Sequence, residues 1–372
     1  LDLIKKVVTD NSDNIDFVGY TASDDNIFAN GHQFGRNGMT DALVVKFNSL
    51  GTRMWGTYYG GSSEEKGNDI TIDPNKNIYI IGTTSSTDNI NYLGTNTTLS
   101  GSSDAFVTSF KDDGNIIWST YYGGSLYDEG NAIFSDGQYL YFGGSTLSGS
   151  GIAFNGFQNS HGGGSDGFLV KFDFLQNGFW GTYLGGSGTD FLYDIYSTGT
   201  GIYTAGSTQS TNNVALLGWQ QGYGGGGSDG YLTKYLPGGI VEWSTYYGGT
   251  NTEVLEGISN SNKLLISGHT NSDNNIGQDG FQNNYTGQLD AMFAEMSESE
   301  LSLNLSEDKY CSGKEYDVNI DFLNLTFENT NEFIVELSDE QGSFGNPDVV
   351  GRKTTNAKTT ITIMLPELTE YS

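Results

Sequence analysis

The stretch Trp118-Ser119-Thr120-Tyr121-Tyr122-Gly123-Gly124 decides the fold, because the chain contains three further copies of it. The copies begin at Trp55, Trp180 and Trp243, so successive tryptophans are 63, 62 and 63 residues apart. A fixed period of this size indicates one supersecondary unit copied in series. The chain has 372 residues, which is enough for such a series and a second domain.

Two other markers recur in the same register and extend the series to five repeats. A Gly-x-Thr sequence ends an apolar run in each unit, as in Gly144-Ser145-Thr146, and an aspartate opens the next run 22 or 23 residues after that glycine. We predict repeats at about 1–61, 62–124, 125–186, 187–249 and 250–299. The recurring aspartates are Asp41, Asp104, Asp166, Asp229 and Asp290.

The apolar runs within a repeat are short and rich in β-branched and aromatic residues. In the second repeat they include 69–73, 78–82, 105–110 and 116–121, separated by turn sequences such as Asp73-Pro74-Asn75-Lys76-Asn77. Such runs indicate strands joined by turns. Four strands in each repeat favour a meander, and radially repeated meanders form a β-propeller. The sequence therefore predicts an all-β chain with a propeller of four-stranded blades over 1–299, with five repeats visible and a larger wheel left open.

The repeat pattern breaks near residue 300. Leu301-Ser302-Leu303-Asn304-Leu305 stands where the tryptophan motif would recur, and glycine becomes less frequent beyond it. Alternating apolar and polar residues follow at 316–322, 332–337 and 359–365. This alternation indicates a second, smaller β-domain over 300–372, which we expect to be an immunoglobulin-like sandwich that is short by a strand or two.

Composition excludes several classes of function. The chain has 45 acidic and 16 basic residues and a net charge of −29, so its surface repels nucleic acid. No apolar run reaches the roughly 18 residues that a membrane-spanning helix needs. Cys311 is the only cysteine, which excludes an internal disulfide. We therefore expect neither a nucleic-acid partner nor a membrane-embedded protein.

The repeats resemble the SBBP-type β-propeller repeat over roughly residues 1–298. The matching features are Gly144-Ser145-Thr146, Ser165-Asp166-Gly167-Phe168 and the motif from Trp180 to Gly186. The segment 331–344 is similar to the immunoglobulin-like modules of large secreted proteins from Bacteroidetes-type bacteria, as are Cys311-Ser312-Gly313 and Val350-Gly351. This second resemblance implies export by the type IX secretion pathway and an extracellular or outer-surface location.

The longest connection in each repeat lies between the second and third predicted strands, at 22–40, 85–103, 147–165, 209–228 and 271–289. Four of these loops contain a ring-bearing residue followed by glutamine, while the second loop has Thr95-Asn96 there. Long loops on a rigid scaffold commonly carry binding functions. We predict that they are held on one rim and contact a glycan or a protein partner. The candidate binding residues are His32, Gln33, Phe157, Gln158, Trp219, Gln220, Phe281 and Gln282.

The residues that repeat in every unit have a structural and a functional interpretation. The tryptophans Trp55, Trp118, Trp180 and Trp243 are expected to pack between blades, although four exposed platforms for sugar rings would use the same residues. The recurring aspartates are expected to cap turns, although they could instead form a ring of cation sites. We predict no cofactor, and a Ca²⁺ ion is left open.

No catalytic residue is predicted. The three histidines, His32, His161 and His269, fall in different repeats, so they form no cluster. The sequence favours a non-enzymatic scaffold or adhesion protein at the surface of a bacterium, within a larger surface assembly. Two alternatives are a carbohydrate-active enzyme that uses carboxylates of the propeller channel and a purely structural spacer.

Overall fold

The computed structural model describes residues 1–260, 263–277, 282 and 287–296, followed by strands at 300–305, 315–323, 332–337, 348–354 and 359–364. These residues form strands, turns and loops without a helix, which confirms the predicted all-β class. Accordingly, no helix in this described part is long and apolar enough to cross a membrane. The chain divides into two compact units, Leu1–Glu295 and Met296–Ser372.

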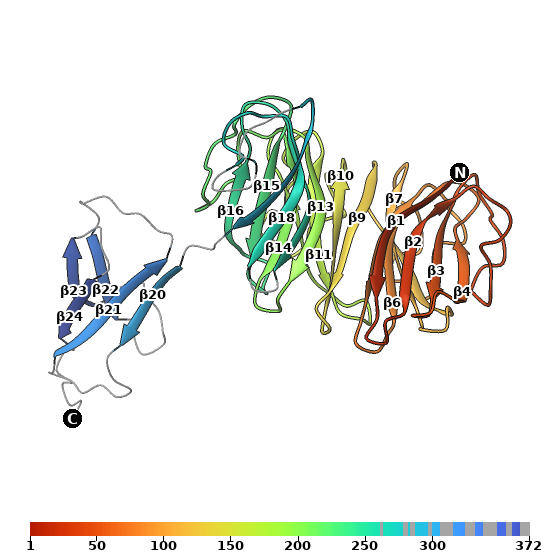
Figure 1. Ribbon diagram of the computed structural model, residues 1–372, viewed down its shortest axis with the longest axis horizontal. Helices are drawn as coiled ribbons and strands as arrows, with labels where there is room; N and C mark the ends of the chain where they lie inside the picture. Colours follow the sequence, from red (N-terminus) through yellow and green to blue (C-terminus); the bar gives the residue numbers. More distant parts are fainter. Residues whose placement is uncertain are drawn as a thin grey trace. The chain divides into compact units, whose positions relative to one another are not determined.

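The first unit consists of successive antiparallel sheets, one for each sequence repeat, which we call blades 1 to 5. Blades 1 to 4 have four strands each and confirm the predicted meander; three strands of blade 5 are described. Figure 1 shows the blades following one another in chain order, from red at the N-terminus to teal. Blade 1 comprises β1 (Asp2–Thr9), β2 (Ile15–Thr21), β3 (Asp41–Phe47) and β4 (Arg53–Tyr59). Blade 2 comprises β5 (Glu65–Ile72), β6 (Ile78–Thr84), β7 (Asp104–Phe110) and β8 (Ile116–Tyr122).

The remaining blades repeat this order. The first strand of each blade packs against the first strand of the next, so the first strands are innermost and the fourth strands lie at the outer edge. Blade 3 comprises β9 (Asp128–Ser135), β10 (Leu140–Thr146), β11 (Asp166–Phe172) and β12 (Gly178–Leu184). Blade 4 comprises β13 (Asp190–Ser197), β14 (Ile202–Thr208), β15 (Asp229–Tyr235) and β16 (Val241–Tyr247). Blade 5 comprises β17 (Glu253–Asn260), β18 (Leu264–Thr270) and β19 (Asp290–Met296).

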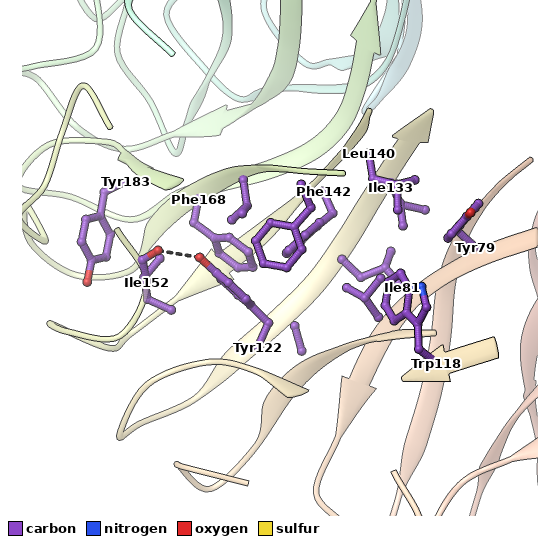
Figure 2. Packing of buried hydrophobic residues seen from close by; sticks show 14 residues of the cluster. Tyr79, Ile81, Trp118, Tyr122, Ile133, Leu140, Phe142, Ile152, Phe168 and Tyr183 are labelled. Atoms are coloured by element: carbon purple, nitrogen blue, oxygen red, sulfur yellow. Dashed lines mark hydrogen bonds between the residues drawn. The ribbon is translucent and has the colours of Figure 1, made fainter. Parts of the chain in front are cut away.

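Adjacent blades are joined by the aromatic residues of the repeated motif. At the junction of blades 2 and 3, shown in Figure 2, the Tyr122 ring lies 5.6 Å from the Phe168 ring. Its hydroxyl donates a hydrogen bond to the Ile152 carbonyl at 2.6 Å. Trp118 is 4% exposed and its indole N–H donates to the Phe174 carbonyl of blade 3 at 3.1 Å. Burial of large rings with satisfied polar atoms makes this motif a joint between blades.

The tryptophans of blades 1 and 3 make the same bond. The Trp55 indole donates to the Asp112 carbonyl at 2.8 Å, and the Trp180 indole donates to the Pro237 carbonyl at 3.1 Å. Each acceptor lies in the turn between the third and fourth strands of the following blade. Trp243 of blade 4 is only partly buried. Trp55, Trp118 and Trp180 thus lie between blades, and Trp243 is partly buried, so none of the four is an open platform.

The first strand of blade 1 is exposed along most of its length. Ile4 and Val7 are 51% and 50% exposed, whereas Leu192 and Ile70, at the same positions of blades 4 and 2, are 0% and 2% exposed. In those blades the residues pack against the preceding blade. Among the described residues no such neighbour covers β1. The described blades therefore leave the number of blades in the wheel open.

In the second unit the structure describes five strands. β20 (Glu300–Leu305), β21 (Glu315–Leu323) and β24 (Thr359–Met364) form one sheet, and β22 (Glu332–Leu337) pairs with β23 (Asp348–Thr354). Residues 301–305, which replace the motif in the fifth repeat, thus pair with β21 in this unit. The immunoglobulin-like identity of this domain stays a prediction.

Candidate functional site

The loops between the second and third strands fold back over the outer edge of their own blade. In blade 1, Ala29 and Gly56 of β4 exchange backbone hydrogen bonds at 2.8 Å in both directions. Phe154 makes the same exchange with Gly181 in blade 3. An outer strand otherwise presents unpaired backbone groups, and covering it prevents pairing with another chain. The loops are therefore held against a rigid strand, on the outer side of the propeller.

The glutamine of each loop pair is part of this attachment. The Gln33 backbone N–H donates to the Thr57 hydroxyl at 2.7 Å, and its side-chain amide donates to Asp41 at 2.8 Å. Its amide oxygen accepts from the Gly60 N–H at 3.1 Å. Each of the other three glutamines of these pairs likewise donates its amide to the recurring aspartate of its own blade. These bonds are Gln158 to Asp166, Gln220 to Asp229 and Gln282 to Asp290, each at 3.2 Å.

The residue before each glutamine is directed to solvent, whereas the glutamine is directed toward the aspartate of its blade. His32 is exposed, and Phe157 and Trp219 are 54% and 61% exposed. Thr95 of blade 2 is exposed at the same position, and Phe281 lies outside the described residues. The structure therefore separates each predicted pair into a fixed glutamine and an outward residue that differs between blades. Exposed aromatic rings of this kind are common contact residues in binding sites.

The recurring aspartates of blades 1 to 4 are buried and accept backbone hydrogen bonds, while Asp290 of blade 5 is partly buried. Asp104 is fully buried and accepts from the N–H groups of Ser100 and Gly101, which makes it a turn cap. A second recurring carboxylate, Asp128, caps the Gly-Gly turn by accepting from Gly124 at 2.7 Å. A Cβ on Gly123 would lie 2.6 Å from the Asp104 carboxyl carbon and 2.8 Å from Asp128, so only glycine fits between them. Blades 1, 3 and 4 repeat this pairing as Asp41 with Glu65, Asp166 with Asp190 and Asp229 with Glu253.

Burial raises the pKa of these carboxyl groups. The pKa of Asp104, of Asp166 and of Asp229 rises to about 6, because burial disfavours the charged form and the second carboxylate of the pair adds repulsion. Within the described residues, no group of three or more His, Cys, Asp or Glu side chains is placed to hold a metal ion. The carboxylate pairs are thus accounted for by the turns that they cap.

We expect the propeller to become more thermostable when the pH is lowered from about 7.5 to about 5. Carboxyl groups with a raised pKa bind protons in the folded state that the unfolded chain has already released, so stability increases as the pH falls through about 6. Partial desolvation lowers the pKa of His32 although its side chain is exposed, and this single group opposes the trend set by several carboxyl groups. Differential scanning calorimetry across this range measures the effect, and Asp104→Asn should reduce it. A Tm that falls on acidification would show that the folded carboxyls are not proton-bound.

Three charged residues meet where the inner strands converge, and no sequence motif predicts them. The Lys6 ammonium of β1 lies 3.7 Å from Asp69 of β5 and 3.7 Å from Asp194 of β13. The two aspartates also accept backbone N–H bonds from the next inner strand, Asp69 from Ile133 at 2.8 Å and Asp194 from Ile258 at 2.9 Å. Burial raises the pKa of Asp69 to about 7, although Lys6 opposes the rise. The other blades have Ala132 and Gly257 here, so this charge set occurs once.

This cluster is the arrangement that the alternative enzymatic interpretation requires, because it places unlike residues from different blades together. The same geometry also fits a structural role in joining neighbouring inner strands, since each carboxylate oxygen of Asp69 and Asp194 already accepts a backbone hydrogen bond. Sequence reasoning missed it because Lys6, Asp69 and Asp194 share a strand position that no repeat marker defines. An alignment of the five inner strands shows charged residues at this position in three blades, and that contrast with Ala132 and Gly257 could have indicated the cluster.

Residues 55–91 match the family model of the SBBP beta-propeller repeat. The match runs from β4 of blade 1 through β6 of blade 2. No curated protein matches the chain. Among solved structures, a mutant of the Synechocystis apocarotenoid oxygenase is similar at 9% identity, over 98% of this chain and 72% of that chain, with a TM-score of 0.34. A likeness at that level carries no argument about activity. The match covers residues 55–91 alone, and together with the four-stranded blades it supports a chain built of β-propeller repeats.

Proposed function

We propose that the chain is an extracellular, non-enzymatic scaffold that holds a glycan or a protein partner on its loops at the bacterial surface. The repeat fold is a generic interaction scaffold, and one observation supports the finer proposal. In each described loop pair the glutamine is hydrogen-bonded to the aspartate of its own blade and so fixes the loop. The residue before the glutamine is exposed to solvent and differs from blade to blade. A rigid frame that presents variable side chains is suited to recognition.

The exposed residues suit sugars and protein surfaces better than charged polymers. His32, Phe157 and Trp219 offer ring faces beside the amide and hydroxyl groups of the loops, whereas the net charge of −29 disfavours anionic partners. The proposal includes export by the type IX pathway and an immunoglobulin-like second domain, as the sequence resemblance implies. A surface location would place the loops in contact with the partner.

A triple variant, His32→Ala with Phe157→Ala and Trp219→Ala, should lose binding on a glycan array and to extracellular matrix proteins by at least about tenfold, since each ring contributes about 1 kcal/mol or more at a contact. Its Tm should stay close to that of the parent, because the three side chains are exposed. The matched control is Leu50→Ala with Leu175→Ala, two residues that are 89% and 79% exposed in turns between third and fourth strands. Unchanged binding by the triple variant, or equal loss in the control, would contradict the proposal.

The same preparations test the enzymatic alternative. Release of reducing ends from polysaccharides, with and without Ca²⁺, would support a carbohydrate-active enzyme and overturn the scaffold. In that case Asp69→Asn and Asp194→Asn should abolish turnover. Saturable binding without turnover supports the scaffold.

A further inference from the structure

One junction of the propeller departs from the others at a single residue. The second tyrosine of the motif occurs in blades 1, 2 and 4, but blade 3 has Leu184 in its place. Wherever the tyrosine is present, its hydroxyl donates a hydrogen bond to a loop carbonyl of the following blade. These bonds are Tyr59 to Ile90 at 2.6 Å, Tyr122 to Ile152 at 2.6 Å and Tyr247 to Ile276 at 2.8 Å. Val214 of blade 4 occupies the position of these acceptor residues. Its carbonyl receives no such hydrogen bond from Leu184, which has no hydroxyl group.

A cavity of about 470 Å³ lies at the junction of blades 3 and 4 and includes the position that a tyrosine ring would occupy. Its lining includes Leu184, Val214, Tyr231, Tyr235 and Ser244. The last four are the register equivalents of the residues that contact Tyr59 at the first junction. There Tyr59 packs against Phe106 and Phe110 with ring centroids 5.1 and 6.1 Å apart, and its hydroxyl also contacts Ser119.

The same junction has gained hydroxyl groups that lack a protein partner. The Tyr231 hydroxyl and the Thr204 hydroxyl are buried and make no hydrogen bond within the described residues, and of these two residues Tyr231 lines the cavity. At the junction of blades 2 and 3 the equivalent residues are Phe168 and Phe142, both of which pack against Tyr122. A buried hydroxyl without a partner costs roughly 1–3 kcal/mol, so such groups in a native fold call for a ligand or ordered water.

We propose that this cavity is a binding site for a single phenolic ring, which takes the place of the absent tyrosine side chain. The ring packs against Tyr231 and Tyr235 as Tyr59 packs against its two phenylalanines, and its hydroxyl donates to the Val214 carbonyl. The cavity volume lies within the range of small-molecule sites, so it accommodates a ring that carries further substituents. Phe157, Ser160 and Leu216, from the loops of blades 3 and 4, also line the cavity. This site does not depend on the loop partner proposed above.

The test uses the whole chain with p-cresol, which is the tyrosine side chain as a free molecule, and toluene, which has its shape without the hydroxyl. We expect saturable binding of p-cresol by calorimetry and binding of toluene about tenfold weaker, because one hydrogen bond is lost. Methyl NMR should show contacts from the p-cresol ring to Leu184 and Val214. N-acetyl-tyrosinamide distinguishes the source of the ring: its binding points to a tyrosine of a polypeptide, and binding of p-cresol alone points to a free small phenol.

The variant Leu184→Tyr should fill the cavity, raise the Tm and abolish p-cresol binding. The matched variant Tyr122→Leu should open a second site at the neighbouring junction and raise the stoichiometry from one to two. Because the NMR contacts are measured on the unaltered protein, a variant that fails to fold leaves the proposal testable. Absence of p-cresol binding, equal affinity for toluene, or undiminished binding by Leu184→Tyr would each overturn the proposal and assign the cavity to water.

Discussion

Lys46→Met should destabilise the propeller by about 3–5 kcal/mol, since it removes a buried ammonium group from between three carboxylates, two of which are buried. The Lys46 ammonium is fully buried and lies 2.8 Å from Asp16, 3.0 Å from Asp112 and 3.2 Å from Asp10. Asp10 and Asp16 belong to blade 1, while Asp112 is in a turn of blade 2. Without the lysine, the Asp16 carboxylate has no cation to offset its burial. Chemical denaturation at neutral pH measures the loss.

The pH dependence of this loss separates electrostatics from packing. Burial raises the pKa of Asp16 to about 6 even though hydrogen bonding to Lys46 opposes the rise. Removing Lys46 raises that pKa further, so the variant should take up a proton and recover part of its lost stability as the pH falls toward about 6. The control is Lys263→Met at the pair with Glu295, where the side chains are 63% and 46% exposed and the expected change is within about 0.5 kcal/mol. A loss in Lys46→Met that is constant with pH would indicate a packing defect.

Trp118→Ala should also cost about 3–5 kcal/mol, because it removes a large buried side chain and leaves the Phe174 carbonyl without its donor. The chain supplies its own control in Trp243, which has the same place in the motif but is only partly buried. Trp243→Ala should cost about half as much. Far-UV circular dichroism in denaturant follows both variants without relying on tryptophan fluorescence. Equal losses would show that the motif stabilises its own blade and not the joint with the next.

The fold was predictable from the sequence because the same physical problem recurs at every junction. A blade must pack against a copy of itself, so Trp118 and its equivalents return at one spacing. Asp104 and its equivalents return because each third strand begins after a turn that needs a cap. The four-stranded blades followed from that register. The glutamines beside the loop rings also repeat, and the structure uses them to attach the loops.

The sites that occur once could not be found from the repeat pattern. Lys6, Asp69 and Asp194 are far apart in sequence and meet only because the inner strands converge. Leu184 is visible in the sequence as a departure from the motif, but its consequence depends on knowing that the tyrosine hydroxyl reaches a carbonyl in the next blade. The repeated residues are sufficient to predict the blades, whereas the effect of a residue that departs from the repeat can be judged only from its neighbours in the structure.

The tryptophan bonds run in one direction, from each blade to a turn of the blade that follows. Coupling between units of a repeat protein is the sum of such nearest-neighbour contacts. Blades 2 and 3 each take part in two of these bonds, whereas blades 1 and 4 each take part in one. Local opening, as amide hydrogen exchange detects it, should therefore be slowest in blades 2 and 3 and become faster toward both ends. The loops of blades 2 and 3 should then keep their conformation while the backbone of the outer described blades unfolds locally and exchanges its amide hydrogens more often.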